Sequence, residues 1–328
     1  MSAENDPLVG RQWHLGAIDV FPVWQEYSGA GVLVGVADNG VQRRHPDVED
    51  NYDRRFEFNY SDGVAGGWPL TADDNHGTAV AGLIAAVGGN GIGGAGVAFD
   101  AGLTSLHLLA AEAGVEADLF RAVGVFDVLN NSWGYGTADE PLPFFDDFLE
   151  RPVFREVATA LDALVSDGRG GLGTVAVFAA GNGREVDDNV NYHNLVSSRF
   201  TIAVAASDRA GDVTHYSNPG AALLVTAPGG VGDIVTTDRT GGAGYRRGDH
   251  TFDFFGTSAA APIVSGVVAL MLEANPALGY RDVQEILAYS ARQTGAGGWR
   301  LNGAGDWNGG GLHVSHDYGF GLDPMFAL

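Results

Sequence analysis

The stretch FFGTSAAAP at residues 254–262, which continues as an apolar run to residue 272, determines how the rest of the chain is interpreted. Thr257 and Ser258 are residue types that cap helix N-termini, and Pro262 is tolerated in an early helical turn. Because the run is almost entirely small or apolar, it predicts a helix over residues 257–273 that is buried on every side. The hydroxyl group of Ser258 would then lie beside free backbone N–H groups at the positive end of the helix dipole. By itself, this pattern indicates only a capped core helix.

Two further stretches change this interpretation. VGVADNG at residues 34–40 is typical of a short strand and ends near Asp38, and DNHGTAVAG at residues 74–82 places His76 at the start of a small-residue helix. Asp, His and Ser occur in this order along the chain of subtilisin, where they form a catalytic triad. A serine hydroxyl is a weak nucleophile near neutral pH and needs a base within hydrogen-bond reach. The three stretches together predict a triad of Asp38, His76 and Ser258.

These motifs resemble those of the subtilisin-like serine proteases, the subtilases. Within that family, SDGRGGLG at residues 166–173, IVTTD at residues 234–238 and VSHDYGFGL at residues 314–322 resemble the kexin/furin-like catalytic domain. The resemblance covers almost the whole chain. It implies a calcium-dependent serine endopeptidase that cleaves polypeptides and prefers a basic residue before the scissile bond.

Strand patterns alternate with helix patterns along the chain. Expected strands cover residues 31–37, 103–109, 125–129, 174–180, 200–205 and 223–225, and expected helices cover residues 20–26, 77–87, 117–123, 154–165, 257–273 and 280–292. This alternation predicts a three-layer, doubly wound α/β fold with a mostly parallel sheet, whose ligands bind outside the carboxyl ends of the strands. With no internal repeat and no linker in the sequence, we expect a single domain over residues 1–328.

Composition excludes several classes of function. The 18 basic and 41 acidic residues give a net charge of −23, which argues against a nucleic-acid partner and suits divalent cations or cationic substrates. The chain has no cysteine, so thiolate chemistry, cysteine zinc sites and disulfides are excluded, and calcium becomes the expected stabiliser of a secreted form.

GNGIGG at residues 89–94 satisfies a dinucleotide-binding fingerprint, but it follows an expected helix rather than a strand. We therefore reject NAD as a cofactor.

Localisation rests mainly on the resemblance, which implies an extracellular, secreted enzyme. Residues 1–30 lack a basic segment followed by an apolar one, so the export route is not visible in this chain. The apolar run at residues 259–272 is too short to span a bilayer, and we expect a soluble monomer.

The resemblance also assigns roles to individual residues. His76 would take the proton from Ser258, Asp38 would orient the imidazole, and Asn182 in VFAAGNG at residues 177–183 would donate to the oxyanion together with the Ser258 N–H. The alternative for Asn182 is an ordinary Asn-Gly turn.

Substrate contacts are expected from a second segment. Asn131, Ser132, Trp133 and Gly134 resemble the family's substrate-pairing segment, with a strand end and a core tryptophan as the alternative. Asp73 is expected near the cleft, together with the acids Asp139, Glu140, Asp187 and Asp188.

The chain departs from the kexin/furin-like pattern at the pocket for the basic residue. Thr137 replaces an early acid, Asn218 stands where glutamate is usual, Asn39 stands where a second aspartate is usual, and an Asp-Gly pair is missing after Tyr192. We therefore expect only a modest basic preference, spread over several subsites.

A calcium site is implied by resemblance, position by position. Its ligands would be Asp6, Asp47, Asn90 and the carbonyl groups of Val87, Ile92 and Gly94, which are the hard oxygen donors that calcium prefers. Asp187 and Asp188 are candidates for a second site or for an exposed acidic loop.

Two other functions compete with the endopeptidase. A catalytically silent calcium- and peptide-binding module on the same fold would have lost a triad or oxyanion residue, and none is lost here. A lipase-type hydrolase would need Gly-x-Ser-x-Gly and the chain order Ser, acid, His, and both are absent.

Overall fold

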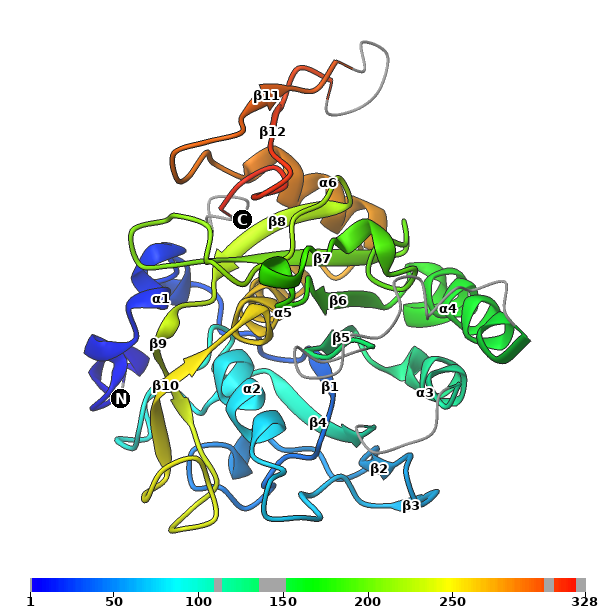
Figure 1. The fold of residues 1–328 in the computed structure, drawn as a ribbon. Coiled ribbons are helices and arrows are strands. Elements are labelled where there is room, and N and C mark those ends of the chain that lie inside the picture. The colour runs from blue at the N-terminus through cyan, green and yellow to red at the C-terminus, as the bar shows by residue number, and fades with distance from the viewer. Residues whose placement is uncertain (1, 109–113, 136–151, 304–309, 323–328) are drawn as a thin grey trace.

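The structure, a computed structural model, describes residues 2–108, 114–135, 152–303 and 310–322. An eight-stranded sheet lies at its centre, with the strand order β3-β2-β4-β1-β5-β6-β7-β8 (Figure 1). The strands are β1 (Leu33–Asp38), β2 (Phe58–Asn59), β3 (Val64–Ala65), β4 (Gly102–His107), β5 (Val128–Asn131), β6 (Val175–Ala179), β7 (Thr201–Ser207) and β8 (Leu223–Pro228). All neighbouring pairs are parallel except β2 and β3.

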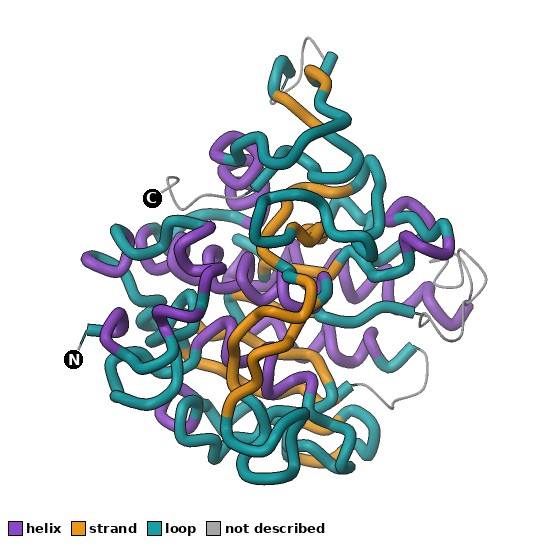
Figure 2. Tube along the Cα trace, turned by 60° about the vertical axis from the view of Figure 1, so that its left-hand side comes forward, coloured by secondary structure: helices purple, strands orange, loops and turns teal. Residues whose placement is uncertain are grey.

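Helices cover both faces of this sheet (Figures 1 and 2). The helices are α1 (Trp13–Ala17), α2 (His76–Ala85), α3 (Glu116–Ala122), α4 (Pro152–Gly171, with non-helical backbone at residues 168–170), α5 (Thr257–Ala274) and α6 (Tyr280–Ser290). One buried cluster joins the sheet to α2, α5 and α6, and a second joins it to α3 and α4. The predicted three-layer, doubly wound, mostly parallel α/β fold is confirmed.

Successive residues of a central strand serve the two layers in turn. On β5, Val128 belongs to the cluster around α5, whereas Leu129 belongs to the cluster around α3 and α4. On β6, Val177 and Phe178 alternate in the same way. Both faces are therefore buried, which explains why these strands are continuously apolar in the sequence.

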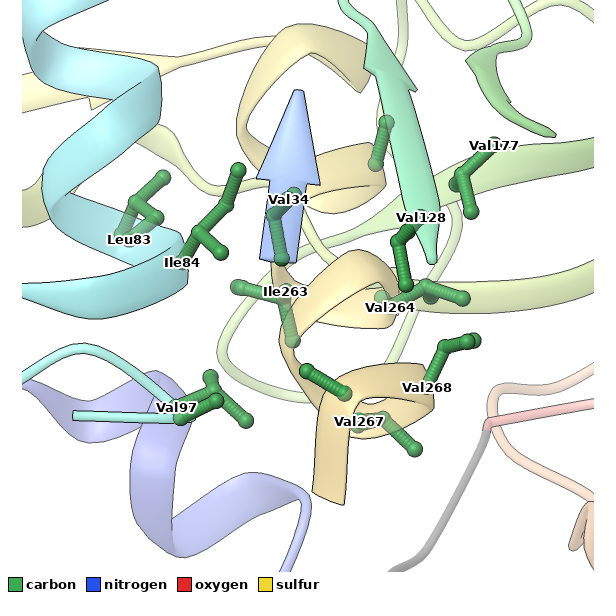
Figure 3. Packing of buried hydrophobic residues seen from close by; sticks show 14 of the residues in the cluster. Val34, Leu83, Ile84, Val97, Val128, Val177, Ile263, Val264, Val267 and Val268 are labelled. Carbon is green, nitrogen blue, oxygen red and sulfur yellow. The ribbon is translucent and has the colours of Figure 1, made fainter. Parts of the chain in front are cut away.

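Helix α5 runs through the first of these clusters, and its residues from 259 to 272 are all buried (Figure 3). A Cβ atom at Gly266 would lie 2.6 Å from Cβ of Val97, so glycine is needed for the close approach of the helix. With 18 residues, α5 is longer than the apolar run and meets the length and composition expected of a membrane span, but 83% of it is buried inside the protein. It is the only such helix in the described ranges.

Helix α5 starts differently from the expectation. Gly256, with φ of 111°, is the N-cap, and Thr257 and Ser258 lie in the first turn without capping it. Glycine tolerates this positive φ, which turns the chain sharply from the preceding strand into the helix. The predicted capping role of Thr257 and Ser258 was wrong, and their side chains are free for other contacts.

Two further regions depart from the predictions. β9 (Val231–Thr237) and β10 (His250–Phe255) form an antiparallel hairpin outside the main sheet, with register shifts on both sides of Phe254. The helix expected at residues 20–26 was wrong, since only a short 3-10 turn forms at Val23–Gln25, and α1 lies earlier. A small hairpin of β11 (Arg300–Leu301) and β12 (His313–Val314) lies near the C-terminus.

Candidate active site

The carboxyl end of β1 meets the amino end of α2. Asp38, the last residue of β1, is fully buried, and its carboxylate accepts from the backbone N–H of Asn39 at 2.8 Å. His76 is the first residue of α2, and its Nδ1 lies 2.9 and 3.0 Å from the two carboxylate oxygens of Asp38. The Asn39 side chain accepts from the backbone N–H of Gly77 at 2.8 Å, so it ties the two ends together.

The environment of His76 favours its protonated form. Burial alone would lower its pKa, but the charge of Asp38 and the hydrogen bond to it together outweigh burial, and the pKa is raised above its ordinary value of 6.5. The hydrogen bond to Nδ1 leaves Nε2 on the opposite side of the ring as the basic atom of the neutral imidazole. The side chain of His76 is 24% exposed.

Ser258 lies in the first turn of α5 and is partly exposed. Its Oγ donates to the carbonyl group of Ser132 at 3.2 Å, and the Ser132 hydroxyl donates to the Ser258 carbonyl group at 3.1 Å. The ring of Phe254, in the strand that leads into α5, lies 5.4 Å from the His76 ring. Strand β10 therefore brings the start of α5 beside the start of α2.

Asn182 follows β6, and Thr257 fixes the orientation of its side chain. The Asn182 Oδ1 accepts from the Thr257 backbone N–H at 3.0 Å and from the Thr257 hydroxyl at 2.9 Å. A Cβ atom placed on Gly256 would lie 3.4 Å from the Asn182 Nδ2 and 3.6 Å from the Ser258 backbone nitrogen. The two nitrogen atoms therefore both lie near the start of α5, and Asn182 is exposed to solvent. The contribution of Thr257 was missed, because a helix-capping pattern gives no sign that the side chain contacts the distant loop after β6.

The predicted substrate segment lies at the end of β5. Asn131 is buried, and its Nδ2 donates to the carbonyl groups of Leu129 and Val177, each at 3.3 Å. The ring of Trp133 packs against Phe178, with ring centroids 5.7 Å apart. Gly134 is exposed, and no atom lies within 4 Å of a Cβ placed on it.

The expected acids are distributed unevenly. Asp73 is exposed in the turn before α2, and Asp187 is exposed in the loop after β6. Asp188 contacts His193 and Asn218. Thr137, Asp139 and Glu140 lie outside the described residues.

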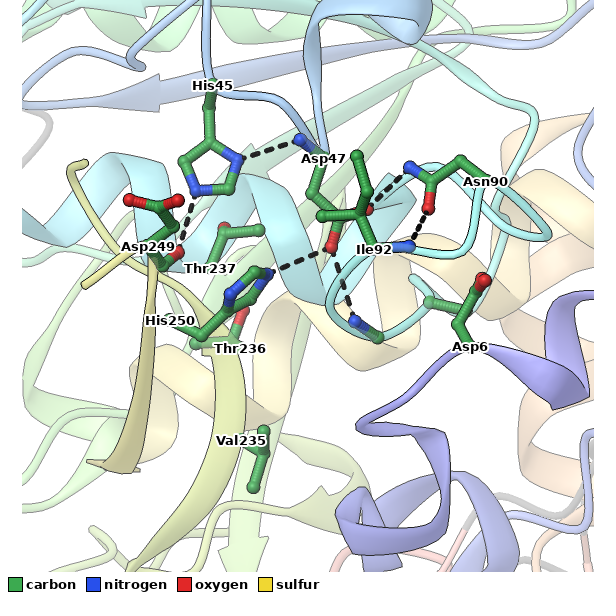
Figure 4. A network of polar contacts seen from close by, with 12 residues as sticks. Asp6, His45, Asp47, Asn90, Ile92, Val235, Thr236, Thr237, Asp249 and His250 are labelled. Atoms are coloured by element: carbon green, nitrogen blue, oxygen red, sulfur yellow. Dashed lines mark hydrogen bonds and ion pairs between the residues drawn. The ribbon is translucent and has the colours of Figure 1, made fainter. Parts of the chain in front are cut away.

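The residues predicted to bind calcium come together around a glycine-rich loop (Figure 4). Asp6 accepts from the backbone N–H groups of Gly89 and Gly91, at 2.5 and 2.8 Å. Asp47 is fully buried and accepts from the Asn90 side chain at 2.8 Å, from the Gly94 N–H at 3.3 Å and from the His250 Nε2 at 3.1 Å.

The remaining predicted ligands, Val87, Ile92 and Gly94, belong to the same loop. The Val87 N–H donates to the Asp47 carbonyl group at 2.9 Å, and the Ile92 N–H donates to the Asn90 Oδ1 at 2.7 Å. Among the described residues, no three His, Cys, Asp or Glu side chains form a metal-binding group, so a cation here would also need amide and carbonyl oxygens. Calcium accepts such ligands.

Comparison with known proteins agrees with this geometry. Residues 29–321 match the subtilase family. The chain belongs to the subtilase family. Human furin is 34% identical over 99% of the chain, and kexin of Saccharomyces cerevisiae is 34% identical over 97% of it.

Solved structures point to the same family. This subtilase chain superposes on the serine protease of Aeromonas sobria with a TM-score of 0.84 and 26% identity, covering 98% of this chain and 66% of the other. Fervidolysin from Fervidobacterium pennivorans gives a TM-score of 0.70 with 25% identity, covering 98% of this chain and 46% of the other. The chain spans only 40% of furin and 38% of kexin.

Proposed function

We propose that this subtilase chain hydrolyses peptide bonds, with Ser258 as nucleophile, His76 as general base and acid, and Asp38 as the group that orients His76. The observation that carries this proposal is that Asn182 Nδ2 and the Ser258 backbone nitrogen, the two expected oxyanion donors, both lie near Gly256 at the start of α5. The Asp38–His76 hydrogen bond supplies a base of suitable basicity nearby. A capped core helix would need neither feature.

In the acylation half of the reaction, the Ser258 Oγ leaves the Ser132 carbonyl group and turns to the His76 Nε2. The oxygen attacks the substrate carbonyl carbon while His76 takes its proton. Negative charge then develops on the carbonyl oxygen, which accepts from Asn182 and from the Ser258 N–H. The protonated His76 is stabilised by Asp38 and gives its proton to the leaving amine, so the peptide bond breaks and an acyl ester of Ser258 remains.

In the second half, a water molecule replaces the amine. His76 removes a proton from this water as the water oxygen attacks the ester carbonyl carbon. Asn182 and the Ser258 N–H again donate to the oxyanion. Collapse of this intermediate returns the proton to the Ser258 Oγ and releases the carboxylic acid product. Asp38 stays ionised throughout and acts only through His76.

Substrate would extend along Ser132, Trp133 and Gly134, with a modest preference for basic residues before the scissile bond. Gly134 supports this proposal, since it is exposed and has open space beside it. Exposed acids such as Asp73 support the basic preference, because they attract cationic side chains without gripping them tightly.

We also propose that the 87–94 loop binds calcium through Asp6, Asp47, Asn90 and the carbonyl groups of Val87, Ile92 and Gly94. Asp6 is only 4% exposed and Asp47 is fully buried, and two buried carboxylates beside the same glycine-rich loop favour a bound cation. Calcium would act at this loop as a structural ion and would take no part in the chemistry.

The wider setting is part of the same proposal. We propose one catalytic domain over residues 1–328, because Asp6 contacts the 87–94 loop and Leu322 bridges to Thr226 beside the main sheet. We also propose that the protein is an extracellular monomer that acts on polypeptides. Outside the cell the calcium concentration is high enough to fill a loop site of modest affinity. Light scattering of the purified chain would test the monomer.

A fluorophosphonate probe tests the central claim. It should label the active chain at Ser258, as identified by peptide mass spectrometry, and Ser258→Ala should abolish both labelling and peptide hydrolysis while the melting temperature stays unchanged. Ser265→Ala is the matched control, since Ser265 is a buried serine of the same helix that binds Asn130 at 2.8 Å. A folded chain that binds peptide but neither reacts with the probe nor hydrolyses would be the silent binding module instead.

A further inference from the structure

The buried segment Tyr216-Ser217-Asn218 lies between β7 and β8 and belongs to none of the triad motifs. Tyr216 is 5% exposed, and Ser217 and Asn218 are fully buried. Each of the three side chains makes a hydrogen bond to a backbone group of another segment. The hydrogen bonds to Gly183 and Gly256 reach the two segments that carry the proposed oxyanion donors.

Asn218 holds the peptide groups on both sides of Asn182. Its backbone N–H donates to the Gly181 carbonyl group at 3.0 Å, and its Oδ1 accepts from the Gly183 N–H at 2.7 Å. A Cβ atom on Gly181 would lie 2.3 Å from the Asn218 Nδ2, so this contact leaves no room for a side chain. Asn218 therefore fixes the peptide group before Asn182 and the peptide group after it.

Tyr216 holds the chain just before Ser258. Its hydroxyl accepts from the Gly256 N–H at 3.1 Å and donates to the Gly230 carbonyl group at 2.6 Å. The Gly256 N–H also donates to the Gly229 carbonyl group at 3.0 Å, so Tyr216 and the backbone of Gly229 hold Gly256 together. Gly256 is the N-cap of α5, so its position sets the direction in which the first N–H groups of the helix point.

The segment itself is anchored from both ends. The Ser217 hydroxyl accepts from the Ala206 N–H of β7 at 3.0 Å. On the other side, the Asn218 Nδ2 donates to Asp188 at 2.7 Å, and Asp188 also accepts from the His193 Nε2 at 2.8 Å. Burial would raise the pKa of Asp188, but the hydrogen bond and charge of His193, with further hydrogen bonds, lower it, so Asp188 stays an ionised acceptor.

We propose that Tyr216–Asn218 is a positioning segment that aligns both halves of the oxyanion hole, with Asn218 setting the Asn182 amide and Tyr216 setting the Ser258 N–H. The segment touches no reacting atom and acts through Gly181, Gly183 and Gly256. This inference rests on the proposed peptidase activity and deepens it. Holding the neighbours of both donors from one segment keeps the spacing of the donors constant, which matters because small misplacements of catalytic groups are costly.

The test combines substitutions at both ends of the segment with removal of the donor itself. Asn218→Ala should lower kcat about tenfold to a hundredfold and leave KM within about twofold, because the donors act mainly in the transition state. In an Asn182→Ala background, Asn218→Ala should change kcat by less than about twofold, since the amide that it positions is gone. Tyr216→Phe should lower kcat as well, and it should keep that effect in the Asn182→Ala background because it acts on the other donor.

Asn191→Ala is the matched control. Asn191 lies in the same loop as Asp188 and accepts from the Ala222 N–H at 3.1 Å, so its loss loosens the loop while the contacts of Asn182 remain. Its kcat should stay within about twofold of the wild type. If Asn218→Ala fails to fold, Asp188→Asn replaces it, since it weakens the support of Asn218 without emptying a buried position, and its smaller loss of kcat should also vanish in the Asn182→Ala background.

Binding gives an independent measurement. A peptide boronate forms a tetrahedral adduct with Ser258, so its affinity should fall in Asn218→Ala, whereas the affinity of the product peptide should stay constant. The inference is overturned if Asn182→Ala loses activity and Asn218→Ala does not, or if the two effects simply add. Normal turnover in Asn182→Ala would instead overturn the oxyanion role in the proposed function.

Discussion

Two regions of this molecule contain the same pair of side chains in different surroundings. At the start of α2, the buried Asp38 contacts His76 at 2.9 Å, and at the glycine-rich loop the buried Asp47 contacts His250 at 3.1 Å. The exposed fractions of the two histidine side chains are 24% and 13%. An aspartate–histidine contact therefore does not by itself define a catalytic site.

The difference lies in what surrounds each pair. Asp38 has one further donor, the Asn39 N–H, and the His76 ring lies 5.4 Å from the ring of Phe254, in the strand that leads into α5. Asp47 accepts additional hydrogen bonds from Asn90 and Gly94, which both belong to the 87–94 loop. We therefore expect the first pair to control turnover and the second to control stability.

Removing each histidine in turn is the strongest test of this comparison. His76→Ala should lower kcat by roughly 10⁶-fold, the loss that the same substitution causes in subtilisin, with little change in melting temperature. His250→Ala should leave kcat within about threefold but destabilise the fold by about 1–3 kcal/mol, because a buried carboxylate loses a donor. Steady-state kinetics and thermal melts of both variants measure this, and similar kcat losses would erase the distinction.

Calcium should stabilise the fold at the loop that contacts Asp47 and should not act at the Asp38–His76 pair. A free concentration about a hundred times the dissociation constant should stabilise the native state by roughly 2.7 kcal/mol, because the unfolded chain lacks the site. Asp47→Ala should lower the melting temperature in calcium and reduce the difference between calcium and chelator. Asp50→Ala is the control, since Asp50 is exposed and is not a proposed ligand. An unchanged melting temperature on chelation would remove calcium from this loop.

Substrate preference should depend on salt. Solvated acids near the cleft attract a basic side chain by about 1 kcal/mol or less each, and salt screens them. Matched peptides with Arg, Lys, Leu or Phe before the scissile bond should therefore show a modest basic preference that weakens at high ionic strength. A strong Leu or Phe preference at low salt would make the surface acids irrelevant, and an Arg preference that ignores salt would require a buried acid.

The pH dependence should reflect the partner of His76. Activity needs neutral His76, so kcat/KM should rise with pH through its pKa, and the raised pKa puts the midpoint above 6.5. In Asp38→Asn the charge that raises the pKa is lost while burial remains, so the midpoint should move to lower pH as the rate falls by roughly 10⁴-fold. A midpoint that stays in place in Asp38→Asn would mean that another group titrates.

Local sequence patterns were enough to predict the two helices that carry the site, α2 and α5, and the main sheet except its short edge strands β2 and β3. Continuous apolar strands such as β6 and the small-residue helix α5 follow from local composition, because burial on both faces requires apolar residues throughout. Motif order also suggested Asp38, His76 and Ser258 as a group, and the structure brings Asp38 into contact with His76. The hairpin of β9 and β10 was missed because the register shifts around Phe254 disturb the alternation that predicts strands.

The sequence by itself therefore determined the type and order of most elements. It also determined which residues lie at the carboxyl ends of the sheet strands. Tertiary structure decided which polar groups meet there. Thr257 orients Asn182 across 75 positions of the chain, and Asn218 fixes Gly183 across 35. The physical reason is that propensity and periodicity depend on neighbours in sequence, whereas a hydrogen bond between distant segments depends on packing that brings both partners within about 3 Å.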